Sequence, residues 1–419
     1  MNLTNLVVSQ WLLKLYVPNK EKALVNSALF AFIFLFGRII DGIADPIIGY
    51  LSDHLKSPRG RRVPFILYGG IPFALVYFLI WLPPYPGEQH WLNAVYVFAL
   101  VQILFILLTI VVNPYLSLLP EISSDLKERV NISTWQAVFV MIGTIVFGLM
   151  GLVVQSWGWL GMGIVVAALI MISFYPTAFF VKEKFTAPQT ELPRVKFSLI
   201  FEWIQLTFKN RAFVILVIAT SFYWFALNMM IMLVPFWVQY VLKMGEQQVT
   251  LVMGPFLITN LLLFGVFNIL AKKKGKYSLF LVTLFGSGLV MPLLYLVGSL
   301  PVDNLLATQI CFGLMGIPVA GFLMLPFAIL SDVVDYDETL TGKRREAIYF
   351  GVQGVIQKAT IGISIAVATW LMYAGGDKLP TELGLKLTAV LSALLCLIGG
   401  FVFLKYPLRE SEGKTQIKN

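Results

Sequence analysis

Three charged residues lie inside an apolar run that begins near Ala23, and their spacing points to chemistry. Arg38, Asp41 and Asp45 are placed at i, i+3 and i+7, so a helix carries them on one face. A charge at membrane depth is costly and normally faces a bundle interior or a water-filled cavity, where it handles ions, protons or substrate. The spacing therefore predicts a coupling site on a membrane-spanning helix.

The composition supports a membrane setting for that helix. Hydrophobic residues make up 58% of the 419 positions and charged residues 13%, whereas soluble domains carry about 25% charged residues. We therefore predict an all-α membrane protein with twelve transmembrane helices, of which the first is short and is expected to lack its first turns. The spans are predicted at residues 3–17, 23–52, 62–82, 91–119, 131–156, 159–181, 211–241, 247–271, 277–299, 304–332, 346–375 and 382–406.

The Lys and Arg residues predict the orientation. If the N-terminus is cytoplasmic, the cytoplasmic loops and tail hold 23 Lys and Arg residues and the opposite side holds five. This distribution follows the positive-inside rule and places both termini in the cytoplasm. The net charge of +9 then reflects topology and contact with anionic lipid, and nucleic-acid binding is not expected.

A hydrophilic stretch divides the twelve spans into six plus six. We expect an N-terminal six-helix bundle (1–181), a cytoplasmic linker with an amphipathic helix (182–210), a C-terminal six-helix bundle (211–406) and a cytoplasmic tail (407–419). Two six-helix halves around a central linker are typical of the major facilitator fold. No nucleotide-binding loop or hydrolytic triad is visible, so an enzyme or an ATP-driven pump is not predicted.

The Cys and His residues predict no metal site. Cys311 and Cys396 fall within predicted spans, while His54 and His90 lie at loop edges and form no ligand cluster. We therefore expect no cofactor and no structural metal, only a coupling ion.

Three separated motifs make the chain similar to a known family. They are GRIIDGIADPIIGYLSD followed by KSPRGRRVPFI, NPYLSLLPEIS after the fourth span, and SDVVDYDETLTGKRREAIYFGVQGVIQKA across spans 10 and 11. Together they resemble the glycoside-pentoside-hexuronide:cation symporters, the melibiose permease family of the major facilitator superfamily. The resemblance covers nearly the whole chain.

The resemblance implies a cation site. Asp41 and Asp45 match the family's paired carboxylates on helix 2, Thr109 matches a hydroxyl ligand on helix 4, and Lys358 matches a lysine on helix 11. Two carboxylates close together in low dielectric need Na⁺, a proton or a basic partner, and Arg38 and Lys358 are candidate partners. The alternative is a static buried salt-bridge network.

Residue 44 bears on the identity of the ion. Sodium-using relatives in this family place an asparagine where this chain has Ala44, between the two carboxylates. A methyl group supplies no oxygen ligand, whereas a carboxylate pair can still take up a proton. The sequence therefore favours H⁺ over Na⁺.

The expected substrate site matches the family less well. Sugar-transporting relatives carry an acidic residue where this chain has Val112 and often an arginine where it has Gln136, and the short first span offers no equivalent of the helix 1 carboxylate. Trp224 and Asn228, at i, i+4, combine an aromatic face with an amide, which suits a sugar. The polar and aromatic residues expected to face a central cavity are Asn113, Trp135, Gln136, Trp224, Asn228, Tyr349, Gln353 and Gln357.

Charged residues next to the spans are expected to form a cytoplasmic gate. The alternative is that they lie in solvated loops and only set the topology, since exposed ion pairs contribute little. The candidates are Asp53, Arg59, Arg61 and Arg62 near the 2–3 loop, and Asp332, Asp335, Arg344 and Glu346 near the 10–11 loop.

The leading interpretation is a secondary transporter in the plasma membrane that couples a sugar, a glycoside or a similar small polar solute to H⁺ or Na⁺ by alternating access. A transporter of lysophospholipids or other amphiphiles is the second interpretation, because family relatives move such lipids. A non-transporting scaffold or receptor is the third, and the buried Asp41 and Asp45 argue against it. The protein is expected to be a monomer.

Overall fold

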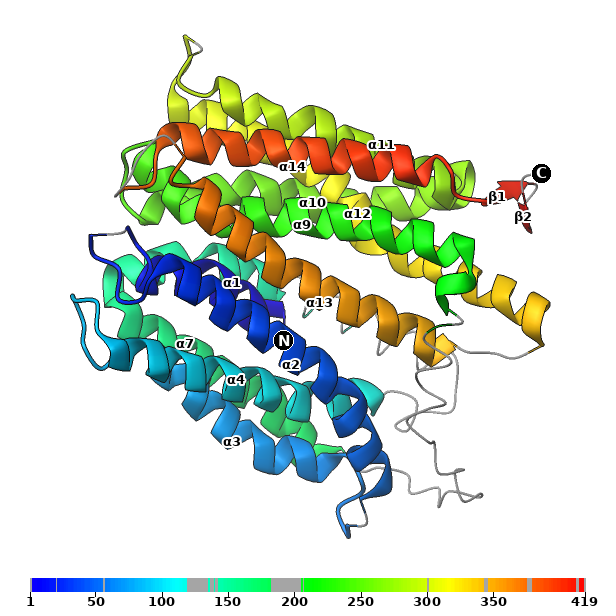
Figure 1. Cartoon of the computed structure of the whole chain (residues 1–419). Coiled ribbons are helices and arrows are strands. Elements are labelled where there is room, and N and C mark those ends of the chain that lie inside the picture. Colours follow the sequence, from blue (N-terminus) through cyan, green and yellow to red (C-terminus); the bar gives the residue numbers. More distant parts are fainter. Residues whose placement is uncertain are drawn as a thin grey trace. The chain divides into compact units, whose positions relative to one another are not determined.

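The computed structural model describes residues 2–19, 21–55, 57–118, 135, 139, 142–181, 205, 207–299, 301–342, 346–374, 379–411 and 414–417. Within these ranges the regular secondary structure is helical except for one small hairpin, in which β1 (Leu408–Ser411) pairs antiparallel with β2 (Lys414–Ile417) (Figure 1). The all-α prediction is confirmed.

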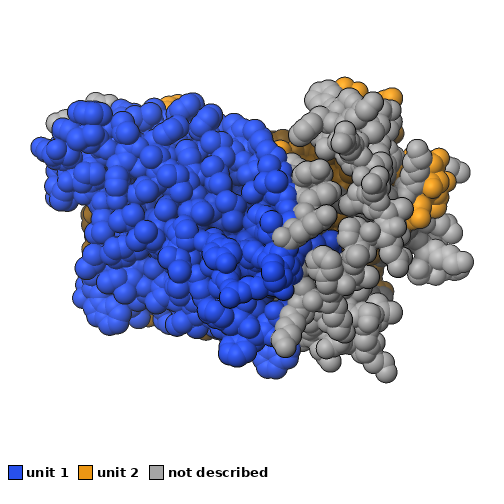
Figure 2. Space-filling view, turned by 90° about the horizontal axis from the view of Figure 1, so that it is seen from below, with its two compact units in different colours: residues 1–191, 244–250, 376–379 blue, residues 192–243, 251–375, 380–419 orange. Residues whose placement is uncertain are grey.

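The chain divides into two compact units (Figure 2). Unit 1 comprises Met1–Glu191, Met244–Thr250 and Gly376–Leu379, and unit 2 comprises Leu192–Lys243, Leu251–Gly375 and Pro380–Asn419. The predicted domain boundaries and the amphipathic helix remain predictions, because most of the linker lies outside the described residues.

The helices of unit 1 pack as a bundle in which α2 lies against α4 and α3 lies against both α4 and α7. Two of them begin with a side-chain cap. Asn26 accepts hydrogen bonds from the first amides of α2, and the His90 ring accepts one from Leu92 of α4. The bounds are α1 (Asn2–Tyr16), α2 (Ser27–His54), α3 (Val63–Leu79), α4 (Trp91–Ser117) and α7 (Met150–Phe180).

Unit 2 is a second helical bundle, in which α9 packs against α13 and α14, and α11 packs against α12 and α14. Its elements are α9 (Arg211–Tyr240), the part of α10 (Gln247–Lys274) that follows Thr250, α11 (Lys276–Val290), the 3-10 helix η1 (Met291–Leu296), α12 (Asn304–Thr341), α13 (Glu346–Leu371) and α14 (Glu382–Phe403).

The helices correspond to the predicted spans. In the described part of the chain, nine helices are long and apolar enough to cross a bilayer, and α3 is a shorter apolar helix. The end of predicted span 5 and nearly all of predicted span 6 lie in α7. Within α7, Gly158 has a non-helical φ of 64°, and this break separates span 5 from span 6. A left-handed φ suits glycine, which lacks a Cβ.

The helix α12 is longer than predicted. Its 38 residues, from Asn304 to Thr341, extend over about 57 Å at about 1.5 Å per residue, nearly twice the roughly 30 Å of a hydrocarbon core. The acidic residues Asp332 and Asp335 therefore lie on a continuous helix that projects beyond the membrane.

Candidate cation-coupling site

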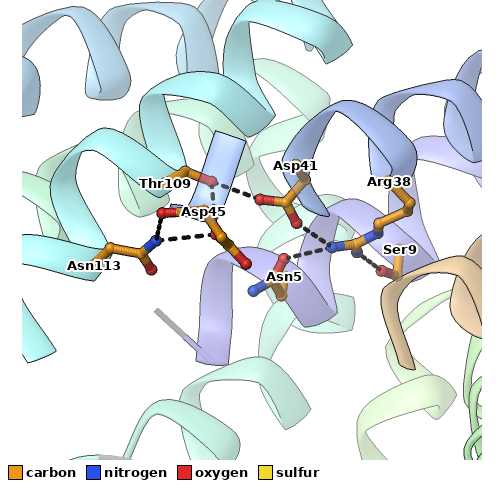
Figure 3. Close-up of polar contacts among 7 residues, drawn as sticks. All are labelled: Asn5, Ser9, Arg38, Asp41, Asp45, Thr109 and Asn113. Atoms are coloured by element: carbon orange, nitrogen blue, oxygen red, sulfur yellow. Dashed lines mark hydrogen bonds and ion pairs between the residues drawn. The ribbon is translucent and has the colours of Figure 1, made fainter. Parts of the chain in front are cut away.

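Asp41 and Asp45 lie one turn apart on α2 and converge on one hydroxyl of α4 (Figure 3). The Oγ1 atom of Thr109 lies 2.6 Å from Asp41 Oδ1 and 3.4 Å from Asp45 Oδ1. Asp41 is 2% exposed and Thr109 is equally buried, while Asp45 is half-buried. Three oxygen-bearing side chains therefore meet in a setting that excludes most water.

Asn113 completes the α4 side of the cluster. It lies one turn after Thr109, and its Nδ2 donates to Asp45 Oδ1 at 3.0 Å and approaches the Asp45 carbonyl at 3.5 Å. The sequence predicts Asn113 as a substrate contact; the structure places it beside the carboxylate pair, and its contact with substrate remains a prediction. Each carboxylate thus has a donor from α4.

Arg38 supplies the positive charge of the cluster. Its Nη1 lies 3.7 Å from Asp41 Oδ2, and the guanidinium stacks over the Phe105 ring at 4.4 Å. The same group donates to Asn5 Oδ1 at 3.3 Å and to Ser9 Oγ at 3.4 Å, both on α1. These contacts hold the guanidinium on the Asp41 side of the pair.

Sequence reasoning missed Asn5 and Ser9. Their i, i+4 spacing puts them on one face of the first helix, and this was the available signal. Small polar residues are common in membrane helices, where they serve helix packing, so the spacing alone did not single them out.

The cluster joins one cationic and two acidic side chains. Arg38 stays protonated, and a bound proton or Na⁺ would lower the negative charge of the Asp41–Asp45 pair. Pro46, directly after Asp45, has no N–H, so the Gly42 carbonyl cannot receive the usual helical hydrogen bond from residue 46.

The other predicted cation residue, Lys358, lies half-buried on α13 in unit 2. Its role beside the carboxylates remains a prediction.

The predicted substrate residues occupy several helices. Trp224 and Asn228 are half-buried on α9, where the Asn228 amide donates to the Trp224 carbonyl at 2.8 Å and the Trp224 ring meets Phe322 edge-on. On α13, Tyr349 is fully buried and its hydroxyl accepts from Asn210, whereas Gln353 is 4% exposed and Gln357 is half-buried. Trp135 is 62% exposed, and Gln136 lies outside the described residues.

The predicted gate residues are only partly described. Arg59 is exposed, Arg61 half-buried and Arg62 buried, while Asp53 belongs to α2 with its side chain outside the description. On α12, Asp335 is exposed, and Asp332 forms a 2.5 Å ion pair with Lys276 at the start of α11, a partner that the sequence did not predict. Glu346 begins α13 with an undescribed side chain, and Arg344 falls outside the described ranges.

These features define a polytopic helical membrane protein with buried ionisable groups inside a helix bundle, the architecture of a secondary transporter. The chain belongs to the family described as MFS/sugar transport protein, which matches residues 1–408. Membership confirms the predicted major facilitator fold, and it confirms a transporter rather than an enzyme.

The relatives include symporters that are named for different transported molecules. The chain is 25% identical to an uncharacterized symporter of Synechocystis (92% of this chain, 88% of the relative) and 24% identical to the isoprimeverose transporter of Lactiplantibacillus pentosus (90% and 78%). It is 26% identical to the sodium-dependent lysophosphatidylcholine symporter 1-B of Danio rerio (95% and 84%).

Solved structures share the fold. A bacterial homologue of the iron transporter ferroportin, in an inward-facing state, superposes with a TM-score of 0.65 at 15% identity, over 97% of this chain and 94% of that one. A nucleoside transporter superposes with a TM-score of 0.62 at 15% identity, over 97% and 98%.

Proposed function

We propose that the protein is a cation-coupled symporter of a sugar or glycoside that works by alternating access. The carboxylate pair carries this proposal. Asp41 is paired with Arg38, and Asp45 is half-buried and contacted by Thr109 and Asn113. A cation that binds at Asp45 would lower the negative charge of the carboxylate pair, so occupancy by the ion changes the cost of burying the site during transport.

The proposed coupling ion is H⁺. The donors Arg38, Thr109 and Asn113 already satisfy the two carboxylates, and Ala44 adds no oxygen. A proton on Asp45 needs no coordination shell, whereas Na⁺ requires several oxygens around it. Na⁺ is the second candidate, favoured by the Gly42 carbonyl and by the relatives that are named sodium-dependent.

The proposed cargo is a small hydroxyl-rich solute. The isoprimeverose transporter and a putative glycoside/cation symporter among the relatives support this class. Trp224 offers an aromatic face and Asn228, Gln353 and Gln357 offer amides, which together suit a sugar ring and its hydroxyls. Asn113, Tyr349, Trp135 and Gln136 complete the proposed contact set. Tyr349 has 0% exposure and would meet substrate only in another state.

A lysophospholipid is the second candidate cargo. Relatives with this cargo align over 93–95% of the chain at 24–26% identity. Val112, which is apolar and 4% exposed, stands where sugar-transporting relatives carry an acidic residue in helix 4. The absence of that acidic side chain favours a less polar cargo.

The distribution of Lys and Arg residues between the loops supports the proposed membrane orientation. We place the protein in the plasma membrane as a monomer with both termini in the cytoplasm. The cytoplasmic gate is assigned to the charged residues near the 2–3 and 10–11 loops, including the Lys276–Asp332 pair.

Uptake into proteoliposomes tests the proposal. Purified protein is offered isoprimeverose, other glycosides and a lysophosphatidylcholine, each with an inwardly directed H⁺ gradient in sodium-free buffer and, separately, with a Na⁺ gradient. Accumulation of a glycoside above its external concentration is expected only with an ion gradient, and Asp45→Asn should remove it. Uptake of lysophosphatidylcholine alone would replace the sugar assignment, and gradient-independent equilibration would refute symport.

A further inference from the structure

The buried ion pair between Arg38 and Asp41 is open. The Arg38 Nη1 atom lies 3.7 Å from Asp41 Oδ2, whereas a charged hydrogen bond between these groups closes to about 2.7–2.9 Å. The Arg38 Nε atom is buried and has no hydrogen-bond partner in the described part of the chain. By comparison, the partly exposed Lys276–Asp332 pair closes to 2.5 Å. The carboxylate one turn away is therefore the strongest acceptor near Arg38, and the guanidinium does not close on it.

Neutral groups hold the guanidinium on its other sides. The Phe105 ring of α4 lies against it, with 4.4 Å between Arg38 Cζ and the ring centroid. A cation is attracted to the face of an aromatic ring, most strongly where water is scarce. Asn5 and Ser9 of α1 accept hydrogen bonds from the guanidinium at 3.3 and 3.4 Å. These two bonds are long and their acceptors are neutral, so the ring is needed to offset the pull of the carboxylate.

The ring is fixed in a slot on α2. Phe105 is 1% exposed and meets Phe34 edge-on, with 5.8 Å between the ring centroids. A Cβ atom added at Gly37 would lie 2.6 Å from Phe105 Cδ2 and 3.1 Å from Val101 Cγ1, so a side chain there would displace the ring. Gly37 thus admits the ring to the α2 backbone directly before Arg38 in the sequence.

The helix α4 contacts both members of the open pair. Phe105 lies one turn before Thr109, whose hydroxyl donates to Asp41 Oδ1 at 2.6 Å. The ring attracts the guanidinium, and the hydroxyl holds the carboxylate. Arg38 and Asp41 are therefore drawn to different groups of α4 instead of closing on each other.

We propose that Phe105 is a positioning residue that keeps the Arg38–Asp41 pair open, so that the guanidinium competes only weakly with the coupling cation for Asp41. Without the ring, the guanidinium closes on Asp41 through two donors, and the cation must displace a stronger competitor. The ring thereby sets the affinity of the site for its ion. The inference rests on the proposed cation coupling, but not on the cargo or on which ion is bound.

Thermal unfolding of the purified full-length protein measures ion binding without cargo. The melting temperature is recorded against pH in sodium-free buffer and, separately, against NaCl balanced by KCl, because an ion that binds the folded protein raises it. The part of the response that is lost in Asp45→Asn belongs to the site. Phe105→Leu keeps apolar bulk without an aromatic face, and Gly37→Ala displaces the ring. Each should raise the half-saturating concentration of the ion about tenfold.

Matched variants separate positioning from packing. Gly49→Ala is the glycine control on α2, because its Cβ would have nothing within 4 Å, and Phe73→Leu removes an equally buried ring from α3. Both should keep the ion affinity of the wild type. Trifluorophenylalanine in place of Phe105 keeps the shape of the ring but weakens its negative face, so it should raise the half-saturating concentration less than Phe105→Leu does. This variant tests the ring even where Phe105→Leu fails to fold.

The loss of Arg38 decides how the ring acts. Arg38→Gln has no guanidinium to position, so adding Phe105→Leu should leave the ion affinity at the value of Arg38→Gln alone. Trifluorination without effect, or an equal effect of Phe105→Leu in the wild type and in Arg38→Gln, would overturn the positioning role. A wild type stabilised by neither ion would instead overturn the proposed coupling site, and this inference with it.

Discussion

The Thr109 hydroxyl donates to Asp41 Oδ1 at 2.6 Å, although the two residues are 68 positions apart in the sequence. The same oxygen lies 3.4 Å from Asp45. A hydroxyl has one proton to donate and two lone pairs, so Thr109 donates to one carboxylate and is free to accept from the other when that one is protonated. The contact therefore links the protonation state of Asp45 to the hydrogen bonding of Asp41.

Thr109→Val should weaken cation coupling without unfolding the protein. Valine keeps the shape of threonine but cannot accept the hydrogen bond that a protonated Asp45 would donate, at a cost of about 1–3 kcal/mol. Apparent affinity for the coupling cation should fall roughly 10- to 100-fold, as measured by uptake against cation concentration. Thr109→Ser keeps the hydroxyl and is the matched control, and equal affinity in both variants would contradict a role for the hydroxyl.

Asp45→Asn and Asp41→Asn should each abolish accumulation against a gradient while leaving membrane insertion intact. The amide keeps the size and polarity of the carboxylate but can neither hold a cation nor exchange a proton. Uptake in proteoliposomes measures the loss of accumulation, and the yield of protein in the membrane fraction measures insertion. Uphill transport retained in both variants would show that coupling lies elsewhere in the chain.

Arg38→Gln should tighten cation binding and slow turnover. Removing the guanidinium takes away the positive charge beside Asp41, so the site should hold a cation more strongly and release it later. A lower half-saturating cation concentration with a lower maximal uptake rate is expected, and the melting temperature should also fall because a buried charge loses its partner. Arg38→Lys preserves the charge and should preserve most of the affinity.

Ser9→Ala tests whether α1 positions the guanidinium. Ser9 Oγ accepts from Arg38 at 3.4 Å, a long hydrogen bond, so its loss should cost about 0.5–1.5 kcal/mol. A two- to tenfold change in cation affinity is therefore expected with expression unchanged. The neighbouring Gln10→Ala does not touch Arg38 and serves as the comparison, because it should leave cation affinity as it was.

The helix positions were predictable from the sequence, and several partners were not. The period of the apolar residues and the i, i+3, i+7 spacing put Arg38, Asp41 and Asp45 on one face of α2. Which side chains meet that face depends on how α1 and α4 rotate and pack, and a hydropathy pattern does not contain that information. This is why Asn5 and Ser9 were missed and the position of Asn113 beside the carboxylates was not predicted.

Charges near the ends of helices were harder to place for a related reason. Asp332 was expected among the basic residues of the 10–11 loop, and its partner is Lys276. Long-range pairs of this kind follow from the fold and not from local spacing.

The identity of the coupling ion gives the last prediction. Wild-type uptake should be driven by an inwardly acidic pH gradient in sodium-free buffer, because Ala44 provides no oxygen beside Asp41 and Asp45 and a proton needs no coordination shell. Ala44→Asn adds a neutral oxygen next to both carboxylates and should give partial stimulation by Na⁺, with Ala44→Leu as the control that adds bulk without an oxygen. Uptake by the wild type that requires Na⁺ and ignores the pH gradient would show that backbone oxygens such as the Gly42 carbonyl complete a sodium site. The coupling ion would then be Na⁺, while the roles of Asp41 and Asp45 would stand.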